Sequence, residues 1–446
     1  MANLKLIIMK NSTQLILALF LAATFMGCQF IDDLADFGQA REIKDATEIT
    51  EVVTPGSPCI LSSGNYDPMS NYGYVPQIIT NGNSDNSFEV AWWDMASRTI
   101  NITVFDAKGN HVKDIRPAFI GTTGKLLGFT RITKDGNYVV GYSKDNSFGD
   151  KDFEYWIARF DASGKMIFNT RIFGDRPSTE MNSKGAPGTA SSARIVYNEK
   201  TGCICFYTGH TMKYSDNVRH QGGYIGFLDL NGKQLMQCPV NILGNSWFFS
   251  HNFDQRLMVI DGVYYALAHG DAYPRALGFS SWTDNKSSAR NPLVNTTYFS
   301  IPGTKGENIT NTQTGGFVGL PDGNIGIVFA SSVDRTKRDI CFLKVDKAGN
   351  ILASKWLTQN TSSHAVNPRI ACRGNRILVA WEDYNKPVTQ TNYAELDING
   401  QVIGEKTILE NVVLQPLSDW ITLPNGDIIW AVSRKLNQLS VFRIKA

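Results

Sequence analysis

The stretch IARFDASGKMIFNTRI, residues 157–172, carries the pattern on which the fold prediction rests. Strand-like runs flank the turn Asp161–Gly164 on both sides, and this arrangement is typical of a β-hairpin. The core of the pattern is an apolar residue, then Asp, then two further residues and Gly. It recurs along the chain, with its apolar residue at Phe105, Phe160, Leu228, Val345 and Leu396.

A second series of hairpins precedes the first series along the chain. Each of its turns is followed by a strand that reads as buried, such as FEVAWWD, IGIVFASS or ILVAWED. The interval between Asp229 and Asp346 is about twice the others, which fits two units, one of whose turns is lost within residues 278–295. The turns of the second series are predicted at Gly82, Asp135–Gly136, Gly202, Asp261–Gly262, Asp322–Gly323, Gly374 and Asn425–Gly426.

Two hairpins per unit make four antiparallel strands, and the chain holds about seven such units. Repeated four-stranded units predict an all-β fold, a β-propeller of seven blades. Residues 74–446 resemble bacterial propellers in which strands after a DG turn alternate with strands that end in an Asp-x-x-Gly turn. The last unit ends at SVFRIKA as its third strand, so residues 48–62 are expected to supply its outer strand and close the ring. The alternative is two stacked β domains.

The N-terminus predicts export. Lys5 and Lys10 precede an apolar run, residues 15–26, that is too short to span a bilayer. The ending Phe-Met-Gly-Cys at Cys28 resembles a bacterial lipoprotein signal, which implies a lipidated Cys28 and a membrane anchor in the cell envelope, at the outer membrane or a periplasmic face. The alternative is an ordinary secretion signal with Cys28 incidental. We expect a signal at 1–28, a tether at 29–55 and the propeller at 56–446.

Composition argues against two classes of partner or cofactor. The formal net charge is +2, and no run of Lys or Arg is present, so no nucleic-acid partner is expected. Cys203 and Cys205 are two residues apart, and this spacing matches no zinc motif. No metal site is predicted, and the sequence does not identify a cofactor.

Residues 250–275, SHNFDQRLMVIDGVYYALAHGDAYPR, read as one hairpin about Asp261–Gly262. The outer ends of its two strands lie side by side in an antiparallel pair. Reactive side chains gather at these ends, so the hairpin is the predicted centre of a site. They are His251, Asp254 and Arg256 before the first strand, and His269, Asp271, Tyr273 and Arg275 after the second.

Arginine recurs near the start of the first strand of several units. An alignment on the DG-type turns, with one residue of slip, places Gln77, Arg131, Arg194, Arg256, Phe317, Arg369 and Trp420 at one position. The first strand of a blade is innermost, so the four arginines are expected to surround the central channel and bind a carboxylate, sulfate or phosphate. The alternative is that each arginine pairs with an acid of the next unit and locks the ring.

Histidines are predicted on the same face as these arginines. His251 and His364 each stand five residues before an arginine, and His210 leaves the second strand of a neighbouring unit. The start of strand one and the end of strand two lie at one end of a propeller, so these residues form one surface. The full set of predicted ligand-binding residues is His210, His251, Asp254, Arg256, His269, Asp271, Arg275, His364, Arg369, Arg131 and Arg194.

Three functions are compatible with this surface. The first is binding of an anionic or carbohydrate ligand, or of a partner protein. The second is a polysaccharide lyase, in which His251 or Tyr273 is the base and Arg256 stabilises the charge that develops beside a carboxylate. The third is a scaffold subunit of an envelope complex. A metal held by two or three of His210, His251 and His269 is a further option, although no contiguous ligand motif supports it. The binding function is preferred, and catalysis is left open.

Overall fold

The computed structural model describes residues 49–53, 78–94, 97–121, 123–144, 155–173, 192–213, 219–238, 254–269, 277–283, 293–299, 311–385, 388–410, 412–435 and 438–446. The chain divides into two compact units, Met1–Glu42 and Ile43–Ala446, and every described residue belongs to the second. The predicted signal segment, Cys28 and the first part of the tether therefore lie outside the described residues. No helix in the described ranges is long and apolar enough to cross a membrane.

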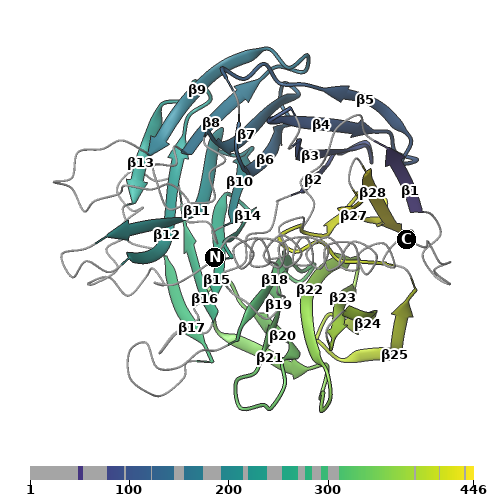
Figure 1. Cartoon of the computed structure of the whole chain (residues 1–446). Helices are drawn as coiled ribbons and strands as arrows, with labels where there is room; N and C mark the ends of the chain where they lie inside the picture. Colours follow the sequence, from purple (N-terminus) through teal and green to yellow (C-terminus); the bar gives the residue numbers. More distant parts are fainter. Residues whose placement is uncertain are drawn as a thin grey trace, which may run out of the picture. The chain divides into compact units, whose positions relative to one another are not determined.

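The described strands form seven sheets of four antiparallel strands each, arranged as blades around a common centre (Figure 1). The prediction of an all-β, seven-bladed propeller is confirmed. The innermost strands of blades 1 to 7 are β2 (Ile79–Gly82), β6 (Leu126–Ile132), β10 (Ala193–Asn198), β14 (Arg256–Ile260), β18 (Gln313–Gly319), β22 (His364–Arg373) and β26 (Ile421–Thr422).

The second strands are the apolar runs that the sequence marked as buried. They are β3 (Phe88–Asp94), β7 (Asn137–Ser143), β11 (Cys203–Lys213), β15 (Val263–His269), β19 (Ile325–Ser331), β23 (Arg376–Tyr384) and β27 (Ile428–Lys435). The third strands are β4 (Thr99–Phe105), β8 (Tyr155–Phe160), β12 (Arg219–Leu228), β16 (Leu277–Trp282), β20 (Asp339–Val345), β24 (Val388–Asp397) and β28 (Gln438–Ile444).

The fourth strands lie outermost. In blades 1 to 6 they are β5 (His111–Ile115), β9 (Met166–Phe173), β13 (Gln234–Cys238), β17 (Val294–Tyr298), β21 (Ile351–Trp356) and β25 (Val402–Leu409). Blade 7 has β1 (Ile49–Val53) in this place, paired antiparallel with β28 from Ile49↔Phe442 to Val53↔Gln438. That this pairing is what closes the ring stays a prediction.

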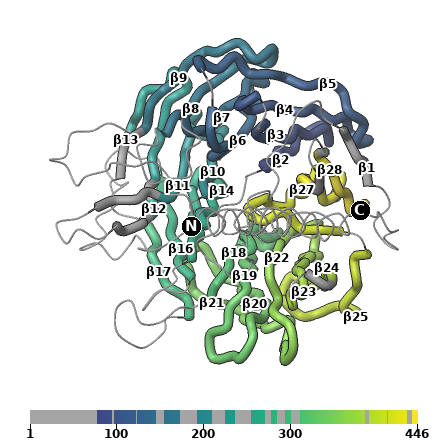
Figure 2. The backbone as a smooth tube through the Cα atoms, viewed as in Figure 1, coloured from purple at the N-terminus to yellow at the C-terminus, as the bar shows by residue number. Residues whose placement is uncertain are grey.

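Buried apolar clusters fill the spaces between neighbouring blades. Trp92 and Phe88 of blade 1 share a cluster with Ile429 and Val441 of blade 7, so packing joins the last blade to the first. The chain visits the blades in sequence order, and the yellow C-terminal strands return beside the earliest ones (Figure 2). Equivalent clusters join the other neighbouring blades. The core is therefore a ring of blade-to-blade interfaces.

The Asp-x-x-Gly pattern forms the turn between the third and fourth strands. In blade 2, Asp161 Oδ1 accepts the backbone N–H groups of Ser163 (2.9 Å) and Lys165 (3.0 Å). Gly164 has φ 89°, a left-handed conformation that costs glycine little. The same two bonds to one aspartate oxygen recur at Asp106, Asp229, Asp346 and Asp397. The repeat therefore has a hydrogen-bonding cause.

The predicted turn at Gly82 is wrong. Gly82 is the last residue of β2, and the turn follows it, with Asn83 N–H donating to Ser87 O at 2.9 Å. Asn86 takes the positive φ, 65°, that glycine takes in most of the other turns. Asparagine tolerates this conformation better than other non-glycine residues. A pattern that looked for glycine therefore missed this turn.

A cation near the end of the third strand joins neighbouring blades at the end of the ring where the turns lie. Arg443 pairs with Asp427 of its own blade at 3.3 Å and donates to Lys108 O (2.9 Å) and Ala107 O (2.6 Å) in the turn of blade 1. Arg159 and Lys344 repeat this arrangement: each pairs with the acid of its own DG turn and donates to the turn of the next blade. We call Arg159, Lys344 and Arg443 the rim cations.

Candidate functional site

Three of the four aligned arginines occupy one register position. Arg194, Arg256 and Arg369 each stand four residues before the last paired residue of their innermost strand, at Asn198, Ile260 and Arg373. Because the strand register is shared, their side chains leave blades 3, 4 and 6 at comparable points.

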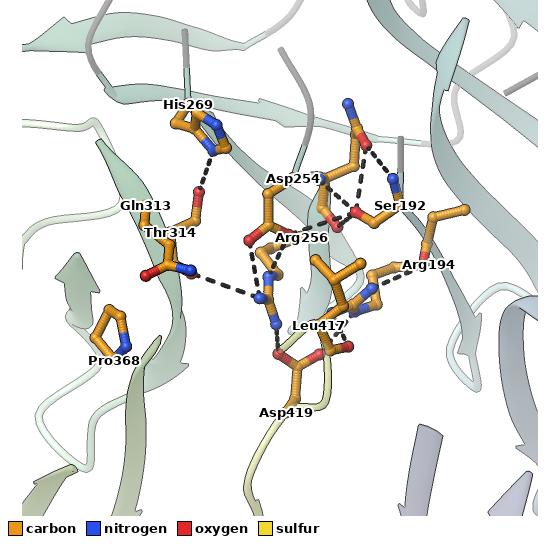
Figure 3. Close-up of polar contacts among 12 residues, drawn as sticks. Ser192, Arg194, Asp254, Arg256, His269, Gln313, Thr314, Pro368, Leu417 and Asp419 are labelled. Carbon is orange, nitrogen blue, oxygen red and sulfur yellow. Dashed lines mark hydrogen bonds and ion pairs between the residues drawn. The ribbon is translucent and has the colours of Figure 1, made fainter. Parts of the chain in front are cut away.

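Arg256 is the most enclosed of them. Its side chain is 2% exposed, and it pairs with Asp254 through Nε–Oδ1 at 2.8 Å and Nη2–Oδ2 at 2.9 Å. Its remaining nitrogen, Nη1, donates to Oδ1 of Asp419 (Figure 3). The bidentate fork and the third bond use every nitrogen of the guanidinium.

Arg194 holds the other oxygen of the same carboxylate. Its Nε donates to Asp419 Oδ2 at 2.7 Å, and its Nη2 donates to the carbonyl of Leu417, also at 2.7 Å (Figure 3). Asp419 precedes β26, the innermost strand of blade 7, so these bonds join blade 7 to blades 3 and 4. Blade 7 neighbours blades 6 and 1 in the ring. The contacts therefore cross the centre. We call Arg194, Arg256, Arg369, Asp254 and Asp419 the central charge cluster.

The segment that delivers Asp419 is itself held by arginine. Leu417 has φ 62°, an uncommon conformation for a leucine. Arg194 binds its carbonyl, and Arg369 binds the carbonyl of Gln415 as well as that of Pro368, the latter at 2.5 Å. Arginine donors from blades 3 and 6 thus fix the backbone of residues 415–417.

Asp419 remains ionised at any physiological pH. Its place deep in the ring would raise the pKa of the carboxyl, but the charges of Arg194 and Arg256 outweigh this and hold the pKa well below the ordinary value of 3.8. Its side chain is nevertheless 40% exposed, whereas Arg194 is 6% exposed. The surface that the cluster offers to solvent is therefore mainly a carboxylate.

The neighbouring residues tie the cluster into blades 3, 4 and 5. Ser192 Oγ accepts the backbone N–H of Gln255 at 2.8 Å. His269, 3% exposed, bonds through Nδ1 to Oγ1 of Thr314 at 3.1 Å (Figure 3). His269 therefore lies in the interior between blades 4 and 5.

Arg131 does not join the cluster. It stands one residue before the last paired residue of β6, and its Nη1 pairs with Glu89 of blade 1 at 2.7 Å. The alignment that grouped it with the other arginines is wrong because hairpin loops differ in length. Four residues separate Ile132 from Asn137, but only two separate Ile260 from Val263. Counting back from the turn therefore does not set the register.

Glu89 and Glu382 are buried acids near these arginines. Burial raises the pKa of Glu89, and hydrogen bonds from Asn83, the charge of Arg131 and a bond from Asn81 oppose the rise. Burial likewise raises the pKa of Glu382, opposed by the N–H of Leu414 at 2.7 Å and by other donors. Both acids are held by donors of their own or a neighbouring blade.

The structure does not bring all the predicted residues together. His364 begins β22, and its Nδ1 accepts the backbone N–H of Arg338 at 3.1 Å, which links blades 5 and 6. His210 lies within β11, which extends to Lys213. Four predicted site residues, including both candidate bases, lie outside the described residues: His251, Asp271, Tyr273 and Arg275.

Sequence reasoning missed Asp419, the residue that links the arginines. It stands beside Trp420, which the alignment had placed with the arginines, and Trp420 is buried at 5% exposure. The available signal in the sequence was an acid, Asp419, one residue before the aligned position at Trp420. Among the described residues, no group of three or more His, Cys, Asp and Glu side chains is arranged to hold a metal ion.

Comparison with known proteins adds likenesses of fold. No family model and no curated protein matches the chain. A Penicillium chrysogenum alpha-L-arabinanase has 12% identity and a TM-score of 0.45, over 89% of this chain and 98% of its own. The polysaccharide lyase Uly1 has 9% identity and a TM-score of 0.45, over 90% and 99%. The Hadza microbial sialidase Hz136 has 12% identity and a TM-score of 0.40, over 76% and 66%. These likenesses assign no activity to this chain.

Proposed function

We propose that this chain is an exported, lipid-anchored β-propeller of the bacterial cell envelope that binds a ligand or a partner protein and does not turn it over. The proposed anchor is supported by the Phe-Met-Gly-Cys sequence at Cys28. The proposed binding is supported by the polar side chains at the centre of the ring. The ring presents a fixed, solvent-reachable polar group at its centre, as a preorganised binding site does.

The hydrogen bonds and burial of Arg256 are the reason we prefer binding over catalysis. All of its nitrogens already donate to Asp254 and Asp419, and its side chain is 2% exposed. Lyase chemistry needs a positive group that is open to the substrate carboxylate. Arg256 would first have to leave two aspartates, one of them 7% exposed, and an uncompensated buried charge is costly. This favours a structural role for Arg256.

A two-part experiment tests the proposal. The first part follows the full chain and Cys28→Ser in membrane fractions of the bacterial host. The lipid-anchored protein is expected in the membrane fraction, and the variant in the soluble exported fraction. A wild-type chain that is soluble would contradict the anchor.

The second part measures thermal unfolding with a panel of oligosaccharides and envelope extracts, together with a lyase assay for unsaturated products. A ligand at a hundred times its Kd stabilises the fold by about 2.7 kcal/mol, which is a measurable rise in Tm. The proposal expects such a rise without product. Product formation would contradict it in favour of the lyase, and no shift with any oligosaccharide or extract would contradict it in favour of the scaffold.

A further inference from the structure

The most exposed group of the central charge cluster is the carboxylate of Asp419, at 40% of its side-chain surface. We propose that this carboxylate binds a neutral, hydroxyl-rich ligand of the carbohydrate class, which donates one hydroxyl to each carboxylate oxygen. The inference rests on the proposed function and names the ligand class for the same ring.

The hydrogen-bonding capacity of Asp419 supports this assignment. An ionised carboxylate offers about four acceptor positions and no donor. Arg256 uses one position on Oδ1, and Arg194 uses one on Oδ2. Each oxygen therefore keeps an acceptor position, and the carboxylate is already fixed by two arginines. A ligand that supplies two adjacent donors completes the set.

The surrounding charges disfavour ligands that carry a net charge at this position. A cation at Asp419 would lie against the guanidinium groups of Arg194 and Arg256, which repel it. An anion would meet the carboxylate first, because the side chains of Arg194 and Arg256 are only 6% and 2% exposed. Two hydroxyl groups avoid both penalties.

Gly316 of blade 5 lies beside Asp419 without a side chain to cover it. Gly316 of blade 5 has φ 111° and lies at a bulge in the pairing of β18 with β19. A Cβ built on it would lie 3.7 Å from Asp419 Oδ1. The same Cβ would lie 3.7 Å from Ile370 Cγ2, so Gly316 and the Ile370 side chain border this side of the carboxylate. Vicinal hydroxyls of a sugar ring are close enough together to reach both oxygens of one carboxylate.

The test uses the full chain purified in detergent. Isothermal titration measures binding of four neutral probes (xylo-, cello-, manno- and arabinopentaose), with tetragalacturonate, calcium chloride and tetraalanine as anionic, cationic and peptide probes. At least one neutral pentaose is expected to bind. Asp419→Asn is expected to weaken its Kd about 10- to 100-fold, because charged hydrogen bonds are lost.

The matched control is Asp261→Asn. Asp261 is 73% exposed in a turn at the ends of the strands, and its φ of 54° suits asparagine. This variant is expected to bind like the wild type. If Asp419→Asn does not fold, Asp419→Glu replaces it: the charge stays but the oxygens move by one methylene, so the same loss of binding is expected.

The outcomes separate the two proposals. A neutral pentaose that binds the wild type and Asp419 variants equally overturns the inference and leaves the binding function standing. Binding of only tetragalacturonate, calcium or tetraalanine does the same. No binding of any probe overturns the inference, and the panel of extracts described above then decides whether the binding function also fails.

Discussion

The centre and the rim of this propeller both join blades through cationic side chains, but they join different partners. At the rim, Arg443 pairs with Asp427 of its own blade 7 and donates to the Lys108 carbonyl in the turn of the adjacent blade 1. At the centre, Arg256 of blade 4 reaches Asp419 of blade 7, across the ring. The rim contacts recur in several blades, whereas the central contacts depend on Asp419, which has no counterpart among the contacts of the described residues in the other blades.

This difference separates what the fold requires from what the individual protein adds. A contact that recurs in several blades stabilises the interface between any two neighbours. A contact made once, in a position that breaks the repeat, is not needed to build a blade. The central charge cluster is therefore where we expect a specific role in binding. Its buried ion pairs, such as Arg256–Asp254, also make substitutions there costly to stability.

The largest expected effect is that of Arg256→Ala. The substitution leaves Asp254 buried without its partner, and breaking a buried ion pair in this way costs about 3 to 5 kcal/mol. The free energy of unfolding in urea measures the effect.

The matched control for the centre is Arg131→Ala, in the same kind of strand. Arg131 is 29% exposed, and Glu89 keeps the donors Asn81 and Asn83. Its expected cost is about 1 kcal/mol. Equal costs at Arg256 and Arg131 would break the distinction between the central charge cluster and an ordinary blade contact.

An intermediate effect is expected for Arg443→Ala at the rim. The substitution removes the pair with Asp427 and the bonds to two carbonyls of blade 1, and we expect a loss of about 2 kcal/mol in the free energy of unfolding. Arg376→Ala is the control, since Arg376 is 48% exposed in its pair with Glu395. A variant of Arg443 as stable as that of Arg376 would argue that the rim cations do not hold the blades together.

The smallest effect is a change in the acid limb of stability. The pKa of Asp419 is depressed in the folded state, so its contribution is present above about pH 4, the unfolded pKa, and is lost as the pH falls through the folded pKa. The fall in Tm between about pH 5 and about pH 2 should therefore be smaller for Asp419→Asn than for the wild type. Parallel curves would show that Asp419 is not held by the arginines.

The fold was predictable because the repeat has a local cause. Each Asp-x-x-Gly turn is held by its own aspartate, so the pattern is visible wherever the turn exists. The rim cations left a signal too, a cation one residue before the apolar residue of the pattern in ARFDASG and LKVDKAG. That signal does not reveal the contact, because its partners lie on the turn of the next blade.

The site was less predictable because it depends on register and on long-range contacts. The strand register of Arg131 depends on the length of the loop between β6 and β7, and the turn glycine alone does not reveal that length. Asp419 precedes a strand with only two paired residues, Ile421 and Thr422, which is too short to be aligned by pattern. Arg256 and Asp419 are 163 residues apart, and only the closed ring brings them together.

A double-mutant cycle tests the cross-ring contact most directly. It measures the free energies of unfolding of the wild type, Arg256→Met, Asp419→Asn and the double variant. Because the two side chains share a contact, we predict a coupling energy of about 1 to 3 kcal/mol. Additive effects, with a coupling below about 0.3 kcal/mol, would contradict a centre locked by arginine and aspartate from opposite blades.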